Sequence, residues 1–277
     1  MSWATFGFEA TKNILEKQLN SGKLVQAYLF CGPEGIGKKT LALELAKKIL
    51  KTENLSNHPD FQMLAEQGEI SVERVRQFIG ALNYKPFLAE KKVAIIDSAQ
   101  NLNSQSGNAL LKTLEEPSSS TILILVASSS RLLPTIVSRC QVFRLNSFST
   151  AQLEKFATTQ GLKTDQEILA LSAGSIARLL GLSGKGAELA EEKQAIARFE
   201  SLKNSSRAEK FLAISEFGSL EIEELTQLFK QWFFWQASEL KKHPQSFFQL
   251  KALGEAINSL RGNKNKKLIL QGLMQRI

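Results

Sequence analysis

The first half of the chain alternates short apolar runs with longer segments in which apolar residues recur every three or four positions. Short apolar runs predict buried strands, and the longer repeat predicts amphipathic helices. The predicted strands are residues 27–31, 61–65, 93–97, 121–127 and 141–145. The predicted helices are residues 40–51, 72–82 with Ser71 as N-cap, and 104–116 before Pro117. Continuous apolar strands that alternate with helices favour a parallel sheet covered by helices on both faces.

The pattern changes near residue 147, and from residue 187 onward no strand pattern is present. Short helices are predicted over residues 150–182, and residues 183–186 (SGKG) are predicted to form a hinge. The fold class is therefore α/β followed by all-α. We expect three parts, at residues 1–146, 147–184 and 185–277.

The clearest helix of the second half spans residues 221–236, because five apolar side chains fall on one side of it. These residues are Ile222, Leu225, Phe229, Trp232 and Trp235. We interpret this stripe as packing core; a ligand-binding aromatic cluster is the alternative.

The charge of the chain favours an acidic partner without requiring one. The 277 residues carry a net charge of +8, from 35 Lys and Arg against 27 Asp and Glu. Such a surplus fits a protein that meets DNA, RNA or an acidic protein, but many soluble proteins are mildly basic. The basic run at residues 261–267 is interpreted as a solvated loop, with nucleic-acid contact as the alternative.

Cysteine usage and hydropathy predict a cytoplasmic protein. Two cysteines, Cys31 and Cys140, do not make a disulfide framework, and with only two histidines no structural zinc site is expected. Cys140 is expected to be a small buried residue. No run approaches the roughly 20 apolar residues that a membrane span needs. The N-terminal residues lack the basic and apolar regions of a secretory signal.

The segment GPEGIGKKT, at residues 32–40, differs at one position from the phosphate-binding pattern G-x-x-x-x-G-K-[ST]. In that pattern the glycines turn backbone N–H groups toward phosphate, the lysine neutralises charge, and the hydroxyl holds Mg²⁺. A lysine stands at the hydroxyl position, and the nearest hydroxyl comes one residue late. The candidate nucleotide-binding residues are Gly32, Gly35, Gly37, Lys38, Lys39 and Thr40.

A second candidate feature is Asp97, at the end of the predicted strand 93–97. In ATPases that carry the phosphate-binding loop, an acid at the end of such a strand helps to hold Mg²⁺. A glutamate usually follows it and orients the attacking water. Ser98 stands at that position, and a serine is not a general base unaided. Both Mg²⁺ binding, at Lys39, and activation of the attacking water, at Ser98, are altered. We therefore expect ATP hydrolysis to be lost. Nucleotide binding through Lys38 and the loop amides remains a separate question.

A third candidate is Arg139, in the loop between the predicted strands 121–127 and 141–145. An arginine at the edge of such a domain can reach a neighbouring subunit and stabilise charge on a transferring phosphate. The alternative is an ordinary surface arginine or one held in an ion pair.

Several segments together resemble the bacterial clamp-loader AAA+ subunits. They are AYLF at 27–30, GPEGIGKKT at 32–40, HPD at 58–60, VAIID at 93–97, NALLKTLEEP at 108–117 and SRC at 138–140. The last two, at this separation, are specific to that family, and the resemblance covers roughly residues 5–180. Within the family the chain is most similar to the delta-prime subunits of DNA polymerase III, because the gamma/tau motor subunits keep an intact GK[ST] and an acidic pair.

The resemblance implies a RecA-like nucleotide-binding domain at 1–146, a helical lid at 147–184 and an oligomerisation collar at 185–277. It implies a five-subunit arc with gamma/tau and delta that uses ATP to open a sliding clamp and place it on primed DNA. In that arc Arg139 would be a finger in the ATP site of the adjacent motor subunit. The chain's own loop would hold ATP or ADP without turnover.

The chain departs from the family at two places. Many members carry a four-cysteine zinc module after the first helix, but residues 51–57 contain no cysteine, so no zinc is expected. Motor subunits usually carry a sensing arginine where this chain has Ala177.

The sequence disfavours two other functions. An active motor subunit is disfavoured by Ser98, and a nucleotide-dependent DNA-binding protein unrelated to clamps is disfavoured by NALLKTLEEP together with SRC.

Overall fold

The computed structural model describes residues 3–66, 68–82, 84–116, 118–128, 132–184, 187–240, 243–262 and 265–277. The chain divides into two compact units, Met1–Ser147 and Phe148–Ile277. The predictions about Pro117, about residues 185–186 of the hinge and about residues 263–264 of the basic run lie outside the described residues. The division into three parts, with boundaries at residues 146 and 184, stays a prediction.

The first unit contains a five-stranded parallel sheet with the strand order β2-β3-β4-β1-β5. Its strands are β1 (Ala27–Cys31), β2 (Phe61–Leu64), β3 (Lys92–Ile96), β4 (Thr121–Ala127) and β5 (Gln141–Arg144). All five predicted strands are confirmed, each to within one residue at either end.

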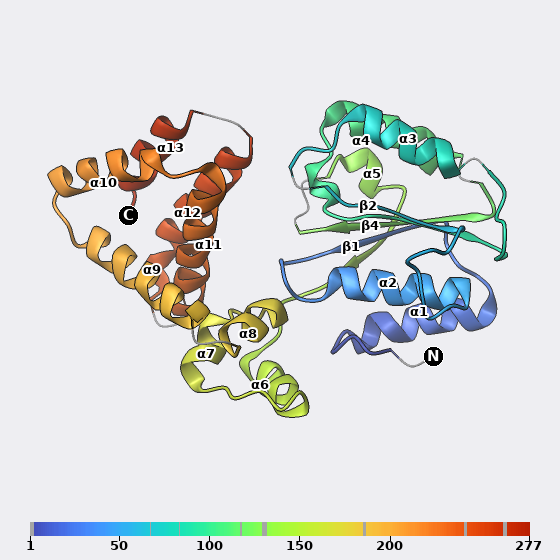
Figure 1. Cartoon of the computed structure of the whole chain (residues 1–277), viewed down its shortest axis with the longest axis horizontal. Coiled ribbons are helices and arrows are strands. Elements are labelled where there is room, and N and C mark those ends of the chain that lie inside the picture. Colours follow the sequence, from blue (N-terminus) through green and yellow to red (C-terminus); the bar gives the residue numbers. More distant parts are fainter. Residues whose placement is uncertain are drawn as a thin grey trace. The chain divides into compact units, whose positions relative to one another are not determined.

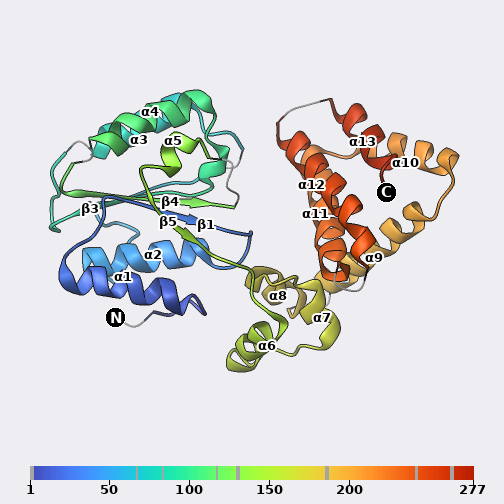
Figure 2. The ribbon, with the colours of Figure 1, turned by 180° about the vertical axis from the view of Figure 1, so that it is seen from behind.

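Helices cover both faces of this sheet (Figures 1 and 2). One face carries α1 (Glu9–Ser21) and α2 (Lys38–Leu50), and the other carries α3 (Val72–Leu82), α4 (Ser104–Glu115) and α5 (Pro134–Val137). A short 3₁₀ helix, η1 (Ala99–Asn101), follows β3. The predicted N-cap of α3 is confirmed, because the Ser71 hydroxyl accepts the N–H of Arg74 at 3.3 Å. The predicted layered α/β fold is therefore confirmed.

The central strands are apolar throughout because both of their faces are covered. Successive side chains of a strand point to opposite faces. Leu29 and Leu125 belong to a core cluster that includes Leu110 of α4. Their neighbours Tyr28 and Ile124 are fully buried as well, which places the second face of the sheet under α1 and α2.

Helix α1 is absent from the sequence-based prediction, and its buried lysine explains the omission. Lys12 is only 6% exposed, on the same helix as the fully buried Leu15. Its ammonium donates to the Thr5 carbonyl and pairs with Glu9 at 3.3 Å. A charged residue at a core position breaks the apolar repeat that would identify the helix.

In the described residues of the second unit, every regular element is a helix, as predicted. These are α6 (Thr150–Thr159), α7 (Gln166–Leu171), α8 (Ile176–Leu182), α9 (Ala187–Lys203), α10 (Arg207–Ser219), α11 (Ile222–Glu239), η2 (Pro244–Ser246), α12 (Phe247–Arg261) and α13 (Lys266–Met274).

The core of the second unit is built around Trp232 of α11. Its ring lies 5.1 Å from Phe199, 5.7 Å from Phe217 and 5.5 Å from Phe229, measured between centroids. Its indole N–H donates to the Ala195 carbonyl at 2.7 Å, so the polar end of the ring is satisfied. The interpretation of the aromatic stripe as packing core is confirmed for this part of α11.

Two details of the sequence-based prediction are wrong in this unit. Ile222 does not join the core: it is 38% exposed, at the first residue of α11 where the chain enters the helix. The basic run is not a continuous loop, because Arg261 is the last residue of α12 and Lys266 and Lys267 form the first turn of α13. The Asn265 side chain caps that helix by accepting the N–H of Leu268 at 3.3 Å, a local signal that favours helix over loop.

A buried ion pair joins the short helices α7 and α8 to α9. The Arg178 guanidinium donates to Glu192 at 2.7 Å and twice to the Leu171 carbonyl, at 2.9 and 3.1 Å. The side chains of Arg178 and Glu192 are 16% and 5% exposed. The guanidinium also lies 4.2 Å from the centroid of the Phe234 ring of α11. The arginine next to Ala177 therefore has a packing role within the second unit.

Candidate functional site

The phosphate loop begins at Gly32, where a side chain would not fit. A Cβ at this position would lie 2.0 Å from the carbonyl oxygen of Leu145. The Gly32 N–H donates to Ala127 at 3.2 Å, and the Leu145 N–H donates to Cys31 at 2.8 Å. The ladder of the sheet thus continues past β1 on both sides and fixes the first residue of the loop.

The loop turns on two further glycines before α2 starts. Gly35 and Gly37 have φ angles of 75° and 99°, in the left-handed region that glycine adopts at little cost. Helix α2 begins at Lys38, two residues earlier than predicted. The free N–H groups and the positive end of a helix macrodipole favour an anion at this point. The predicted order of strand, glycine loop and helix is confirmed.

The side chain of Lys38 is buried against the phosphate loop. It is 6% exposed, and its ammonium donates to the Pro33 carbonyl. Burial lowers the pKa of Lys38 below its ordinary value, while the negative charges of Glu34 and Asp97 oppose that change. A phosphate oxygen would give this buried cation the counter-charge that a carbonyl supplies only in part. Lys38 and the glycine turns thus fit a nucleotide phosphate.

Lys39 and Asp97 form an ion pair, with 3.0 Å between Nζ and Oδ2. The other oxygen of Asp97 accepts the N–H of Ser98 at 2.9 Å. Mg²⁺ requires oxygen ligands at about 2.0–2.1 Å in an octahedral arrangement, and an ammonium group offers donors only. Thr40, the hydroxyl residue that follows Lys39 in the sequence, is an exposed residue of α2. The residues at this place therefore do not fit Mg²⁺.

The residues after β3 provide no second acid. Ser98, Ala99 and Gln100 follow Asp97, and Ser98 has a φ of 56° as the chain turns into η1. The Gln100 side chain accepts the N–H of Ser128 at 2.9 Å, which ties η1 to the end of β4. This stretch holds the strand ends together and supplies no general base.

Arg139 lies between α5 and β5 and forms contacts within its own chain. Its guanidinium donates to the Glu115 carboxylate at 2.6 Å and to the Thr135 carbonyl at 3.0 Å. The Arg139 side chain is 34% exposed and that of Glu115 is 49% exposed. This is the ion-paired arrangement that the sequence left open beside the finger role. The pair links the SRC segment to the NALLKTLEEP segment.

Cys140 packs against the core below this loop as a partly buried side chain. Burial raises the pKa of the Cys140 thiol to about 12. The thiol is therefore neutral at physiological pH, and Cys140 is partly buried where the sequence predicted a buried residue.

Asp60 of the HPD segment is a buried acid to which the sequence assigned no role. It is 1% exposed, and its carboxylate accepts the N–H groups of Phe87, Leu88 and Ala89 at 2.6, 2.7 and 2.8 Å. Burial opposes its charged form, but these three donors outweigh burial, and the pKa of Asp60 is lowered. Asp60 thus fixes the segment before β3. The position of Asp60 immediately before an apolar strand is the sequence feature that could have indicated its structural role.

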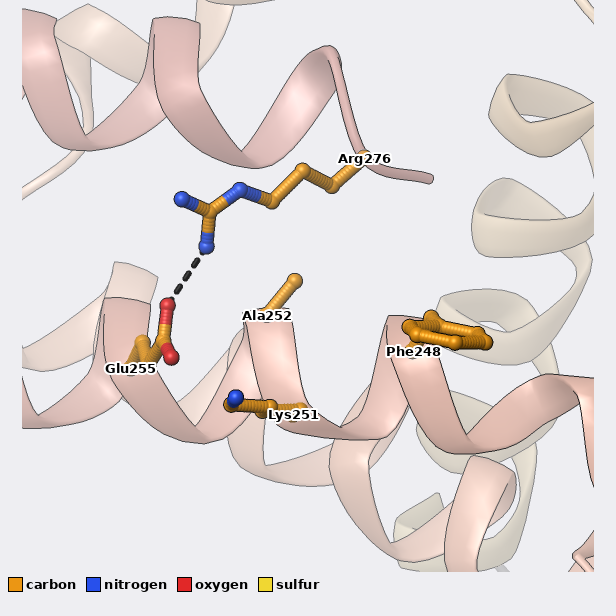
Figure 3. Close-up of a pocket in the computed structure, with 5 residues that line it drawn as sticks. All are labelled: Phe248, Lys251, Ala252, Glu255 and Arg276. Atoms are coloured by element: carbon orange, nitrogen blue, oxygen red, sulfur yellow. Dashed lines mark hydrogen bonds and ion pairs between the residues drawn. The ribbon is translucent and has the colours of Figure 1, made fainter.

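A hollow in the second unit is lined by residues of α12 and by Arg276 (Figure 3). Arg276 donates to Glu255 at 2.5 Å, so these two charges neutralise each other. Phe248, at 76% exposure, and Lys251 complete the rim. The described residues that line the hollow include none of the glycines with which a phosphate loop turns its N–H groups toward an anion. The loop at residues 32–40 therefore remains the candidate site.

The described residues offer neither a cluster of metal ligands nor a helix able to span a membrane. No group of three or more His, Cys, Asp and Glu side chains within them could hold a metal ion. None of their helices combines the length and the apolar character needed to cross a membrane.

A parallel sheet with a glycine loop between β1 and α2 and an acid after β3 defines the P-loop class, and the helical second unit is typical of its AAA+ members. Residues 7–149, more than half of the chain, match the family described as DNA polymerase III, delta subunit. The chain belongs to this family.

Curated relatives agree with this assignment. The chain is 37% identical over 185 residues to DNA polymerase III subunit delta' of Pseudomonas aeruginosa, covering 58% of this chain and 56% of that protein. It is 33% identical over 155 residues to DNA polymerase III subunit gamma of Buchnera aphidicola, covering 50% and 43%. The chain thus spans about half the length of the curated relatives it matches.

The solved structure supports the fold alone. A DNA polymerase III gamma subunit-related protein of Thermotoga maritima has a TM-score of 0.54 at 20% identity, covering 94% of this chain and 97% of that one.

Proposed function

We propose that this chain is an accessory subunit of the DNA polymerase III clamp loader, of the delta-prime kind, which does not hydrolyse ATP itself. The observation that carries the proposal is the ion pair between Lys39 and Asp97. It neutralises the acid that would hold Mg²⁺, and Ser98 follows where a base is needed. The similarity to the Pseudomonas aeruginosa delta' subunit supports the same assignment.

In this proposal the chain acts on a neighbour. It assembles with gamma/tau and delta subunits in the cytoplasm, and supports loading of the sliding clamp onto primed DNA. Arg139 leaves Glu115 and approaches the triphosphate in the adjacent motor subunit. The chain's own loop holds ATP or ADP without turnover, and no zinc takes part.

The test is ATP turnover by the purified chain, alone and assembled with gamma/tau and delta. We expect no turnover alone and stimulation of the assembled ATPase. Rapid hydrolysis by the chain alone would establish the motor function instead, with Thr40 as metal ligand. The similarity to a gamma subunit makes that alternative worth excluding.

A further inference from the structure

We propose that the Lys39 ammonium takes the place of Mg²⁺, so that this loop binds nucleotide phosphates without a divalent cation. The inference deepens the proposed function and rests on its claim that the loop retains nucleotide binding. It concerns how a nucleotide is held, whereas the proposed function concerns what the chain does to a neighbour.

The position of Lys39 supports the substitution. It is the second residue of α2, next to Lys38, and its ammonium lies 3.0 Å from Asp97. In P-loop proteins, the residue at this position of the loop and the acid after the strand hold the metal between them. In this chain the same two positions form a direct contact. The cation that lies between the loop and Asp97 is therefore the Lys39 ammonium, a side chain of the protein itself and not a bound metal ion.

The exposure of the pair leaves the ammonium available to a ligand. The Lys39 side chain is 47% exposed, whereas that of Asp97 is 19% exposed. An ammonium has three donors, and the contact with Asp97 uses one of them. The remaining donors can reach a phosphate oxygen placed at the start of α2 by the loop amides and Lys38.

Charge predicts which form of the nucleotide is preferred. Lys39 and Asp97 sum to zero, so the positive potential at the loop comes from Lys38 and the N-terminus of α2, and Glu34 opposes it in part. A magnesium–nucleotide complex would present its metal to an ammonium, and like charges repel. Free nucleotide carries more negative charge and meets no such repulsion. We therefore expect Mg²⁺ to weaken binding.

The experiment measures binding of ATP and of ADP to the full chain by calorimetry, in EDTA and in excess Mg²⁺. We expect binding in EDTA to be at least as tight as in Mg²⁺, and to be lost in Lys38→Ala. Lys39→Met should weaken binding in EDTA by about tenfold, equivalent to about 1.4 kcal/mol. Lys163→Met removes an exposed lysine of the second unit and serves as the charge-matched control.

Lys39→Thr restores the hydroxyl of the phosphate-loop pattern and should make Mg²⁺ strengthen binding. Circular dichroism and thermal melting of each variant identify any that fail to fold. Stronger binding of the unaltered chain in Mg²⁺, or no binding in either buffer, would overturn the inference. Turnover measurements remain independent, so a chain that hydrolyses ATP contradicts the proposed function whatever the metal dependence.

Discussion

Arg139 and Glu115 contact each other within one chain, with 2.6 Å between Nη2 and Oε1. Because both side chains are substantially exposed, such a pair contributes only about 0–1 kcal/mol to stability. A triphosphate is a stronger partner for a guanidinium than one exposed carboxylate. Exchanging Glu115 for a triphosphate would therefore cost the chain little stability, which is what the proposed finger role requires.

Arg139→Ala should lower the ATPase activity of the assembled complex, because a finger arginine stabilises charge in the transition state. Related arginines contribute about 10³–10⁵ in rate. The measurement is steady-state ATP turnover by the chain mixed with gamma/tau and delta. Glu115→Gln is the matched control and should keep the activity. An unchanged rate in Arg139→Ala would exclude the finger role.

Asp60→Asn should destabilise the first unit by about 3 kcal/mol at neutral pH, since hydrogen bonds to a charged group contribute about 1.5–3 kcal/mol. The pKa of Asp60 is lowered in the folded chain. Its stabilising contribution is therefore present above the ordinary carboxyl pKa of about 3.9 and is lost as the pH falls through the folded value.

Urea unfolding at pH 7 and near pH 3 checks this prediction. The gap in unfolding free energy between the unaltered chain and Asp60→Asn should narrow in acid. Glu90→Gln, at an exposed acid close to the same segment, should change stability little. A gap that is independent of pH would contradict the role of the charged carboxylate.

The sheet and the covering helices α2, α3 and α4 follow from the sequence because burial on both faces leaves a clear apolar pattern. The positions of Gly32 and Lys38 follow as well, since the glycine loop must lie between a strand and a helix. The position of Asp97 follows from the apolar strand that it ends. Helix α1 does not follow, because Lys12 occupies a core position through contacts with Thr5 and Glu9.

Other parts of the site depend on contacts between segments that are distant in sequence. The pairing of Arg139 with Glu115 and the three N–H donors of Asp60 cannot be deduced from local patterns. Nor does any periodicity indicate that Arg178 points into the second unit toward Glu192.

Glu192→Ala should destabilise the second unit by about 3–5 kcal/mol, because it leaves the largely buried Arg178 without its counter-charge. Replacing both partners, as in Arg178→Met with Glu192→Leu, should recover most of the loss. Glu167→Ala, which breaks the exposed pair with Lys193, should cost under about 1 kcal/mol. Chemical denaturation measures all three variants, and equal effects of the two acids would contradict the prediction.

Cys140 should resist alkylation in the folded chain. With a thiol pKa of about 12, only about one thiol in ten thousand is ionised at pH 8, and the thiolate is the reactive form. Labelling with iodoacetamide followed by mass spectrometry should modify Cys140 only after denaturant is added. In the Cys31→Ser variant, Cys140 is the remaining cysteine. Rapid modification of Cys140 in this variant while it is folded would contradict the account.

The close approach of Leu145 to Gly32 gives the first glycine of the loop a purpose that owes nothing to phosphate. Any larger residue would push the backbone after β5 away and break the ladder where the two strands end. Selection for folding alone is therefore enough to retain Gly32. A related protein that no longer binds nucleotides would still be expected to keep this first glycine of the phosphate-loop pattern.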